Sequence, residues 1–220
     1  FKLKPKNLFQ KSLFINHNAD RYSTFFVLML SGAIIFILSV ALENTIYKDE
    51  LTKSMNYLAL QDNTIFVGQQ IVYKGNPMST TIEEVPKERM IETPVFEEIQ
   101  MGMSTGMALE GLVPISCFPR FDFLLRCMDS LVNHLDKMQH MTEGTFKPKV
   151  IMRTSIGSKN PLNGGVQHTQ DYSDPIMRML HEVNVVSLHE PEQIFPAFEN
   201  AYNRDGSSLI IEWGDYYNDK

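Results

Sequence analysis

Cysteine and excess positive charge are both scarce in this chain, and each shortage excludes a class of protein. The two cysteines, Cys117 and Cys127, lack the spacing of metal ligands, so we expect two buried, reduced thiols in a cytosolic protein. The 20 Lys and Arg residues are outnumbered by 26 Asp and Glu residues, which gives a net charge of -6. Nothing in this balance favours a polyanionic partner, and we therefore expect no nucleic-acid binding.

Long apolar runs are also rare, and the one that stands out covers residues 25–42, FFVLMLSGAIIFILSVAL, without a charge. It is just long enough to cross a bilayer, which needs about 20 apolar residues. Basic residues precede the run and acidic residues follow it, a pattern that would keep the N-terminus inside. Three readings stay open: a membrane or interface segment, a buried or partner-contacting helix, or a segment foreign to the domain.

The rest of the chain has the size and pattern of one globular domain. We therefore divide the 220 residues into an N-terminal extension with an apolar helix, 1–45, and a domain, 46–220. Helices alternate with strands in this domain, which predicts an α/β fold with a mostly parallel central sheet between two layers of helices. Helices are predicted at 48–60, 96–109, 121–138, from 174 or 175, and at 191–202; strands are predicted at 64–67, 113–118, 149–154, 183–187 and 208–213.

Two long polar loops are expected to matter for function. They cover residues 74–94 and 155–174 and are rich in Gly, Asn, Pro and Ser. In a parallel sheet, ligands bind beyond the carboxyl ends of the strands. The loops that follow Val67, Phe118 and Arg153 should therefore meet at one edge of the sheet.

The stretch Glu92–Ile99 carries the clearest chemical signal. A proline turn places Glu97 at the start of a helix whose one face bears the small residues Gly102 and Gly106. In apolar surroundings such a carboxyl group can keep its proton and hydrogen-bond a ring nitrogen of a cofactor. The alternative is a plain helix-start carboxylate that the helix dipole favours, and Glu98 is the local runner-up for the role.

Several motifs together resemble a known family. These are FVGQQ (66–70), TPVFEE (93–98), GMALEGLVPISCFPRFDF (106–123), MDSLVNHLDK (128–137) and GGVQHTQ (164–170). In this order they resemble the beta subunit of thiamine-diphosphate-dependent pyruvate and branched-chain 2-oxoacid dehydrogenases, and more broadly the pyrimidine-binding domain of transketolase-like enzymes. The resemblance covers most of the domain and implies its three-layer fold.

The resemblance also implies site residues. Glu97 matches the glutamate that hydrogen-bonds the aminopyrimidine of thiamine diphosphate, and Phe121 matches the aromatic residue that stacks on that ring. His168 matches a histidine near the substrate, where it could donate a proton, although a plain surface histidine is the alternative. Phe123 is expected in the core. Arg120 is either a contact for an anionic substrate or a solvated charge.

The resemblance implies a partner subunit, because one cofactor-binding segment of the family is missing from this chain. Thiamine diphosphate needs a Gly-Asp-Gly segment for its diphosphate and Mg2+, and we interpret the compressed Gly214-Asp215 stretch as a tail. The chain should therefore bind half of the cofactor and no metal, and an alpha-type subunit should supply the rest in a heterotetramer acting on a 2-oxoacid. We expect a cytoplasmic enzyme, with membrane association through residues 25–42 as the alternative.

The chain also departs from the family at two points. Gln69 stands where the family has a glutamate, so its contact with substrate or cofactor would be that of a neutral amide. The sequence ends at Lys220, without the family's further domain, which suggests a biosynthetic carboligase or decarboxylase rather than a dehydrogenase component. These departures leave a non-catalytic assembly or regulatory subunit as the second hypothesis.

Overall fold

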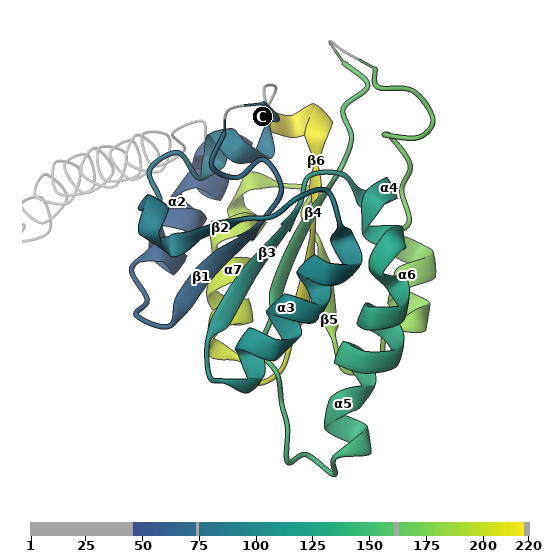
Figure 1. The fold of residues 1–220 in the computed structure, drawn as a ribbon. Coiled ribbons are helices and arrows are strands. Elements are labelled where there is room, and N and C mark those ends of the chain that lie inside the picture. Colours follow the sequence, from purple (N-terminus) through teal and green to yellow (C-terminus); the bar gives the residue numbers. More distant parts are fainter. Residues whose placement is uncertain (1–45, 74, 161–162, 218–220) are drawn as a thin grey trace, which may run out of the picture. The chain divides into compact units, whose positions relative to one another are not determined.

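The computed structural model describes residues 46–73, 75–160 and 163–217, and within them the chain forms a six-stranded sheet (Figure 1). The strand order is β2-β1-β3-β4-β6-β5, and every pair of neighbours is parallel. The predicted mostly parallel sheet is therefore confirmed, in an entirely parallel form. The strands are β1 (Thr64–Gly68), β2 (Met90–Glu92), β3 (Val113–Phe118), β4 (Ile151–Ile156), β5 (Asn184–Ser187) and β6 (Ser208–Trp213).

Helices cover both faces of the sheet, as the alternating sequence pattern predicts (Figure 1). The helices α2 and α7 pack on one face in a core with the inward side chains of β1, β3 and β6. The helices α3, α4 and α6 contribute to a second core on the other face. The helices are α2 (Tyr47–Ala59), α3 (Glu97–Leu109), α4 (Phe121–Leu124), α5 (Asp136–Met141), α6 (Ser173–Met179) and α7 (Pro191–Asn203).

Local sequence explains several helix ends. The helix α7 begins with Pro191 at its first turn, behind a capping box between Glu190 and Gln193. The helix α3 ends at Leu109, and Gly111 follows with a positive φ of 90° that only glycine adopts without strain. These ends lie within one or two residues of the predicted ones.

Two predictions about elements were wrong. Residues 90–92 were predicted as loop but form the edge strand β2, with Met90 opposite Phe66 of β1. Three residues carry no periodic signal, so this strand depends on its neighbour rather than on its own sequence. The predicted single helix at 121–138 is divided into α4, a 3-10 turn (Leu125–Cys127), a π-helical segment (Ser130–Leu135) and α5. The predicted strand at 149–154 begins and ends two residues later.

The predicted apolar helix and membrane segment at residues 25–42 lie outside the described residues. Among residues 46–73, 75–160 and 163–217, no helix combines the length and the apolar character that membrane crossing requires.

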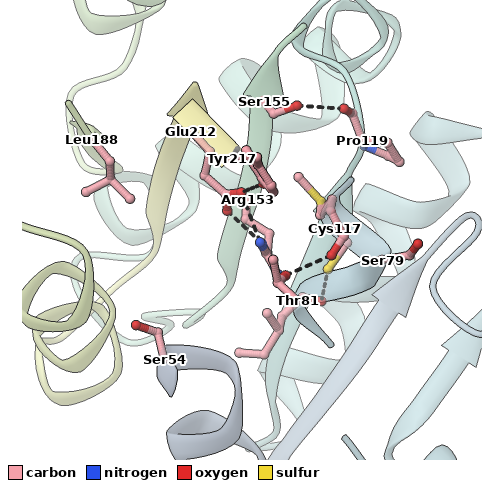
Figure 2. A network of polar contacts seen from close by, with 12 residues as sticks. Ser54, Ser79, Thr81, Cys117, Pro119, Arg153, Ser155, Leu188, Glu212 and Tyr217 are labelled. Carbon is pink, nitrogen blue, oxygen red and sulfur yellow. Dashed lines mark hydrogen bonds and ion pairs between the residues drawn. The ribbon is translucent and has the colours of Figure 1, made fainter. Parts of the chain in front are cut away.

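A buried ion pair connects two central strands (Figure 2). Arg153 of β4 donates to Glu212 of β6 through Nε (2.7 Å) and Nη2 (2.9 Å), and both side chains are fully buried. The same guanidinium donates from Nη1 to the hydroxyl of Thr81 at 3.0 Å, and the Tyr217 hydroxyl donates to Glu212. Burial and the nearby Glu212 charge raise the pKa of Tyr217. The network thus holds the loop before β2 and the turn after β6 against the sheet.

Candidate active site

A cavity of about 540 Å³ opens at the carboxyl ends of the central strands. Its wall combines Gln69 and Gln70 after β1, Arg120 after β3, and His168 in the loop that follows β4. The expectation that these three loops meet at one edge of the sheet is therefore confirmed. Asn76, from the other long polar loop, completes this wall.

Glu97 lies at the base of this cavity as the first residue of α3. Its side chain is 1% exposed, whereas the neighbouring Glu98 is turned to solvent. Oε1 accepts a hydrogen bond from Gln69 Nε2 at 3.1 Å. Oε2 is buried without a hydrogen-bond partner in the described part of the chain, and Arg126 Nε lies 3.6 Å from it. Oε1 of Glu97 is therefore hydrogen-bonded, whereas Oε2 has an ion pair and can still accept a hydrogen bond from a ligand.

The turn after β1 is held by a residue that sequence reasoning missed. Gln70 has a positive φ of 55°, which is uncommon outside glycine. The Glu92 carboxylate accepts the backbone N–H groups of Gln70, Ile71 and Val72. A carboxylate that accepts several backbone N–H bonds fixes a turn firmly. Glu92 thus positions Gln69, although its place directly before Thr93-Pro94 suggested only a turn.

The first turns of α3 are anchored to the sheet from below. Gln100 Nε2 donates to the carbonyl of Cys117 at 2.9 Å and to the hydroxyl of Ser116 at 3.1 Å. Ser104 donates to the Gln100 carbonyl at 2.8 Å and contacts the same Ser116 hydroxyl. Glu97 lies one turn before Gln100, so these bonds also fix the height of its carboxyl group above the sheet.

His168 is half-buried in the cavity wall rather than free on the surface. Its Nδ1 is buried and has no hydrogen-bond partner within residues 46–73, 75–160 and 163–217. The His168 backbone crosses directly over Gly157, where an added Cβ would lie 1.7 Å from the His168 carbonyl oxygen. Only glycine allows this approach, which brings the imidazole to the site. Its catalytic role stays a prediction.

Two aromatic residues at the start of α4 differ from their predictions: Phe121 was expected at the cofactor ring and Phe123 in the core. Phe121 is fully buried and packs edge-on against Tyr172, with ring centroids 5.7 Å apart. It presents no surface to the cavity. Phe123, which was predicted to lie in the core, lines the cavity, and its ring contacts the His168 ring edge-on, with centroids 5.3 Å apart. The aromatic surface available to a bound ring is therefore that of Phe123.

Asp215 anchors the histidine loop and is not a tail residue. Its Oδ1 accepts hydrogen bonds from the Ser158 hydroxyl (2.8 Å) and from the backbone N–H groups of Lys159 (2.7 Å) and Asn160 (3.0 Å). Partial burial alone would raise the pKa of Asp215, but these hydrogen bonds lower that pKa below its usual range. A Gly-Asp pair directly after a parallel strand is the signal that could have indicated this role.

The solvent side of α3 is open. A Cβ added at Gly102 or Gly106 would meet no atom within 4 Å, so neither glycine serves packing in the described residues. Ile99 and Met103 flank them with 47% and 37% of their surfaces exposed. Apolar side chains beside small residues form a surface suited to close helix contact.

Within the described part of the chain, no group of three or more His, Cys, Asp or Glu side chains is placed to hold a metal ion.

Comparison with known proteins identifies a family whose fold agrees with the observed one. The family described as "Transketolase, pyrimidine binding domain" matches residues 46–213. The chain is 29% identical over 115 residues to the mitochondrial pyruvate dehydrogenase E1 component subunit beta of Saccharomyces cerevisiae, covering 51% of this chain and 31% of that protein. It is 29% identical over 130 residues to the corresponding Rickettsia bellii subunit (57% and 39%), and 26% identical over 173 residues to that of Ascaris suum (77% and 47%).

These curated relatives are longer proteins, and this chain aligns with about a third to a half of their length. Among solved structures, one described as "Split gene transketolase, inactive beta4 tetramer" superimposes with a TM-score of 0.59. It is 15% identical, and the match covers 76% of this chain and 51% of that chain, so it supports the fold alone. Since the family match covers most of the chain and the parallel sheet agrees with it, this protein belongs to the transketolase pyrimidine-binding-domain family.

Proposed function

We propose that the chain is the beta-type subunit of a two-chain, thiamine-diphosphate-dependent enzyme that acts on a 2-oxoacid. In this proposal it supplies the half of the site that binds the aminopyrimidine ring. The observation that carries the proposal is the buried Oε2 of Glu97 in the cavity lining, which makes no hydrogen bond within the described residues and has only the Arg126 guanidinium beside it. The pyruvate dehydrogenase beta subunits among its relatives support the same conclusion.

The residues of the cavity fit an aminopyrimidine. A buried carboxyl oxygen that makes no hydrogen bond is destabilising until a ligand supplies one, and a nearby guanidinium at 3.6 Å compensates its charge only in part. Gln69 occupies Oε1 of Glu97, so Oε2 is the atom that would contact a ring nitrogen. Phe123 offers a ring on the same wall. Gln69 therefore supports the site although it is neutral, because its amide donates to the Glu97 carboxyl.

The protein's own part in the reaction is to hold a proton and to orient groups. When bound, thiamine diphosphate would supply the nucleophilic carbon and the electron sink for decarboxylation. Glu97 would share a proton at Oε2 with the ring nitrogen, and burial keeps that exchange apart from bulk water. His168, which also lines the cavity, would donate or accept a proton at the substrate. An acyl or aldehyde fragment would then pass to an acceptor.

The other half of the site would come from an alpha-type subunit, in a heterotetramer. That subunit would hold the diphosphate and Mg2+. The open face of α3, with Ile99, Gly102, Met103 and Gly106, is the surface that we propose for this contact. A non-catalytic subunit is the weaker alternative, because the Glu97 carboxyl is retained in the cavity and Gln69 still hydrogen-bonds it.

The test is reconstitution with a co-expressed alpha-type partner. The purified complex should release CO2 from at least one of pyruvate, 2-oxobutyrate, 2-oxoisovalerate and 2-oxoglutarate, and only when thiamine diphosphate and Mg2+ are present. A matched complex that carries Glu98→Gln, a change at an exposed neighbour, should retain this activity. A complex that assembles but neither binds thiamine diphosphate nor releases CO2 would contradict the proposal.

A further inference from the structure

The wall of the cavity carries more positive charge than its one carboxylate balances. Its lining residues with a carboxyl or guanidinium group are Glu97, Arg120 and Arg126. Arg126 lies beside Glu97, with 3.6 Å between Nε and Oε2. Arg120 has no acidic side chain within ion-pair distance in the described residues, although it is half-buried. One guanidinium on this wall is therefore left for a ligand.

The position of Arg120 is well defined. It directly precedes α4, and its stem lies beside the loop after β4, since an added Cβ at Gly157 would be 3.4 Å from Arg120 Cδ. Gly157 is also the residue over which the His168 backbone crosses. Arg120 and the unpartnered Nδ1 of His168 are thus carried by adjoining segments of one wall. Both can donate hydrogen bonds, so this wall suits an anionic group.

We propose that Arg120 selects substrates by binding a carboxylate that does not react. This rests on the proposed function and adds the substrate class to it: a 2-oxoacid with a second carboxylate, or an acceptor that carries one. Arginine binds carboxylates in a planar, two-point contact. A guanidinium bound to the carboxylate that leaves as CO2 would stabilise the ground state more than the transition state and slow the reaction. The carboxylate bound by Arg120 is therefore one that is not lost as CO2.

The first experiment measures selectivity in the reconstituted complex. We compare kcat/KM for 2-oxoglutarate and for 2-oxopentanoate, which differ by the second carboxylate, in the parent, in Arg120→Gln and in Arg120→Lys. Arg120→Gln should lower kcat/KM for 2-oxoglutarate by about 10- to 100-fold, the usual worth of a hydrogen bond to a charged group. The value for 2-oxopentanoate should change less than about threefold. The matched control is Arg178→Gln, at an exposed arginine of α6, which should alter neither.

If the acceptor supplies the carboxylate, the loss of activity in Arg120→Gln appears in the carboligation step instead. Arg120→Gln then lowers carboligation to succinate semialdehyde but not to butanal, and decarboxylation of the two 2-oxoacids changes equally little. Either pattern supports a carboxylate contact and identifies its source. An equal loss for charged and uncharged partners in both assays, or no loss in any, overturns the inference.

A binding measurement separates this inference from the proposed function. Glutarate and its neutral diamide, glutaramide, are titrated calorimetrically into the complex, where neither can be decarboxylated. Arg120→Gln should weaken glutarate binding at least about tenfold and leave glutaramide within about threefold. This result would keep the anion subsite even if no 2-oxoacid were turned over. Glutarate binding that is unchanged by Arg120→Gln would remove the subsite even from an active enzyme.

Discussion

Removal of one partner from the buried ion pair should destabilise the protein strongly. In Glu212→Gln the neutral amide replaces a carboxylate that accepts 2.7 and 2.9 Å hydrogen bonds from Arg153. Arg153 is fully buried, and it would keep its charge because a guanidinium group stays protonated in proteins even without an acidic partner. The variant therefore leaves an uncompensated cation inside the sheet.

The cost can be estimated from this geometry. Breaking a buried pair on one side costs about 3–5 kcal/mol, a large part of the ~5–15 kcal/mol that stabilises a typical domain. For a domain of this size, that corresponds to a fall in Tm of roughly 6–20 °C. Removing both charges in Arg153→Met with Glu212→Leu should cost less than Glu212→Gln alone, because no buried charge is then left unpaired.

The assay is urea unfolding followed by circular dichroism, with the full chain. The control is Lys147→Gln, which removes a surface pair with Asp205 at 3.9 Å and should cost less than about 1 kcal/mol. A Glu212→Gln variant that loses less than about 1 kcal/mol, with an unchanged dependence on urea, would refute the reasoning. A double variant less stable than Glu212→Gln would refute it as well.

Further predictions concern the cavity, the thiols and the open helix face. Gly157→Ala should displace the histidine loop, because its Cβ would overlap a carbonyl oxygen, and should lower decarboxylation at least about tenfold while the fold persists by circular dichroism. Burial raises the pKa of Cys117 and Cys127 to about 12, so at pH 8 only about one thiol in ten thousand is ionised. Both should resist Ellman's reagent until urea unfolds the chain, and rapid labelling of the native protein would contradict the burial. Gly106→Leu meets no atom within the chain, so the Tm should stay within about 2 °C while partner binding in gel filtration is lost; retained binding would exclude this face as the contact. Gln69→Ala removes the donor to the Glu97 carboxyl and should weaken thiamine diphosphate binding by about 3- to 10-fold in calorimetry; unchanged affinity would show that the amide does not position that carboxyl.

The layered fold could be predicted because its evidence is local. Alternating apolar patterns, the glycine after α3 and the Pro191 start of α7 each act over a few residues. The strand β2 could not be found in this way, since Met90–Glu92 is ordered by pairing with β1. The division of the long helix was missed as well, because the regular apolar spacing gave no reason to expect it.

The site was predictable only in part for the same reason. Glu97 was singled out from its helix start together with the family resemblance; the structure places it buried beside Gln69, and its catalytic role stays a prediction. The helix spacing alone could not say which of Phe121 and Phe123 faces the cavity, because both lie on the first turn of α4. Glu92 and Asp215 accept backbone N–H groups from distant loops; such contacts are not visible in the sequence around Glu92, and only the Gly-Asp pair after a strand hinted at Asp215.

The most direct test of the account is the deuterium exchange rate at the thiazolium carbon of thiamine diphosphate in the reconstituted complex. Glu97→Gln keeps the shape of the side chain but cannot exchange a proton at Oε2, so the rate should fall by about 10²- to 10⁴-fold. Glu98→Gln, one residue further and exposed, should leave it within about threefold. A Glu97→Gln complex that binds the cofactor and exchanges as fast as the parent would contradict the central role of this carboxyl group.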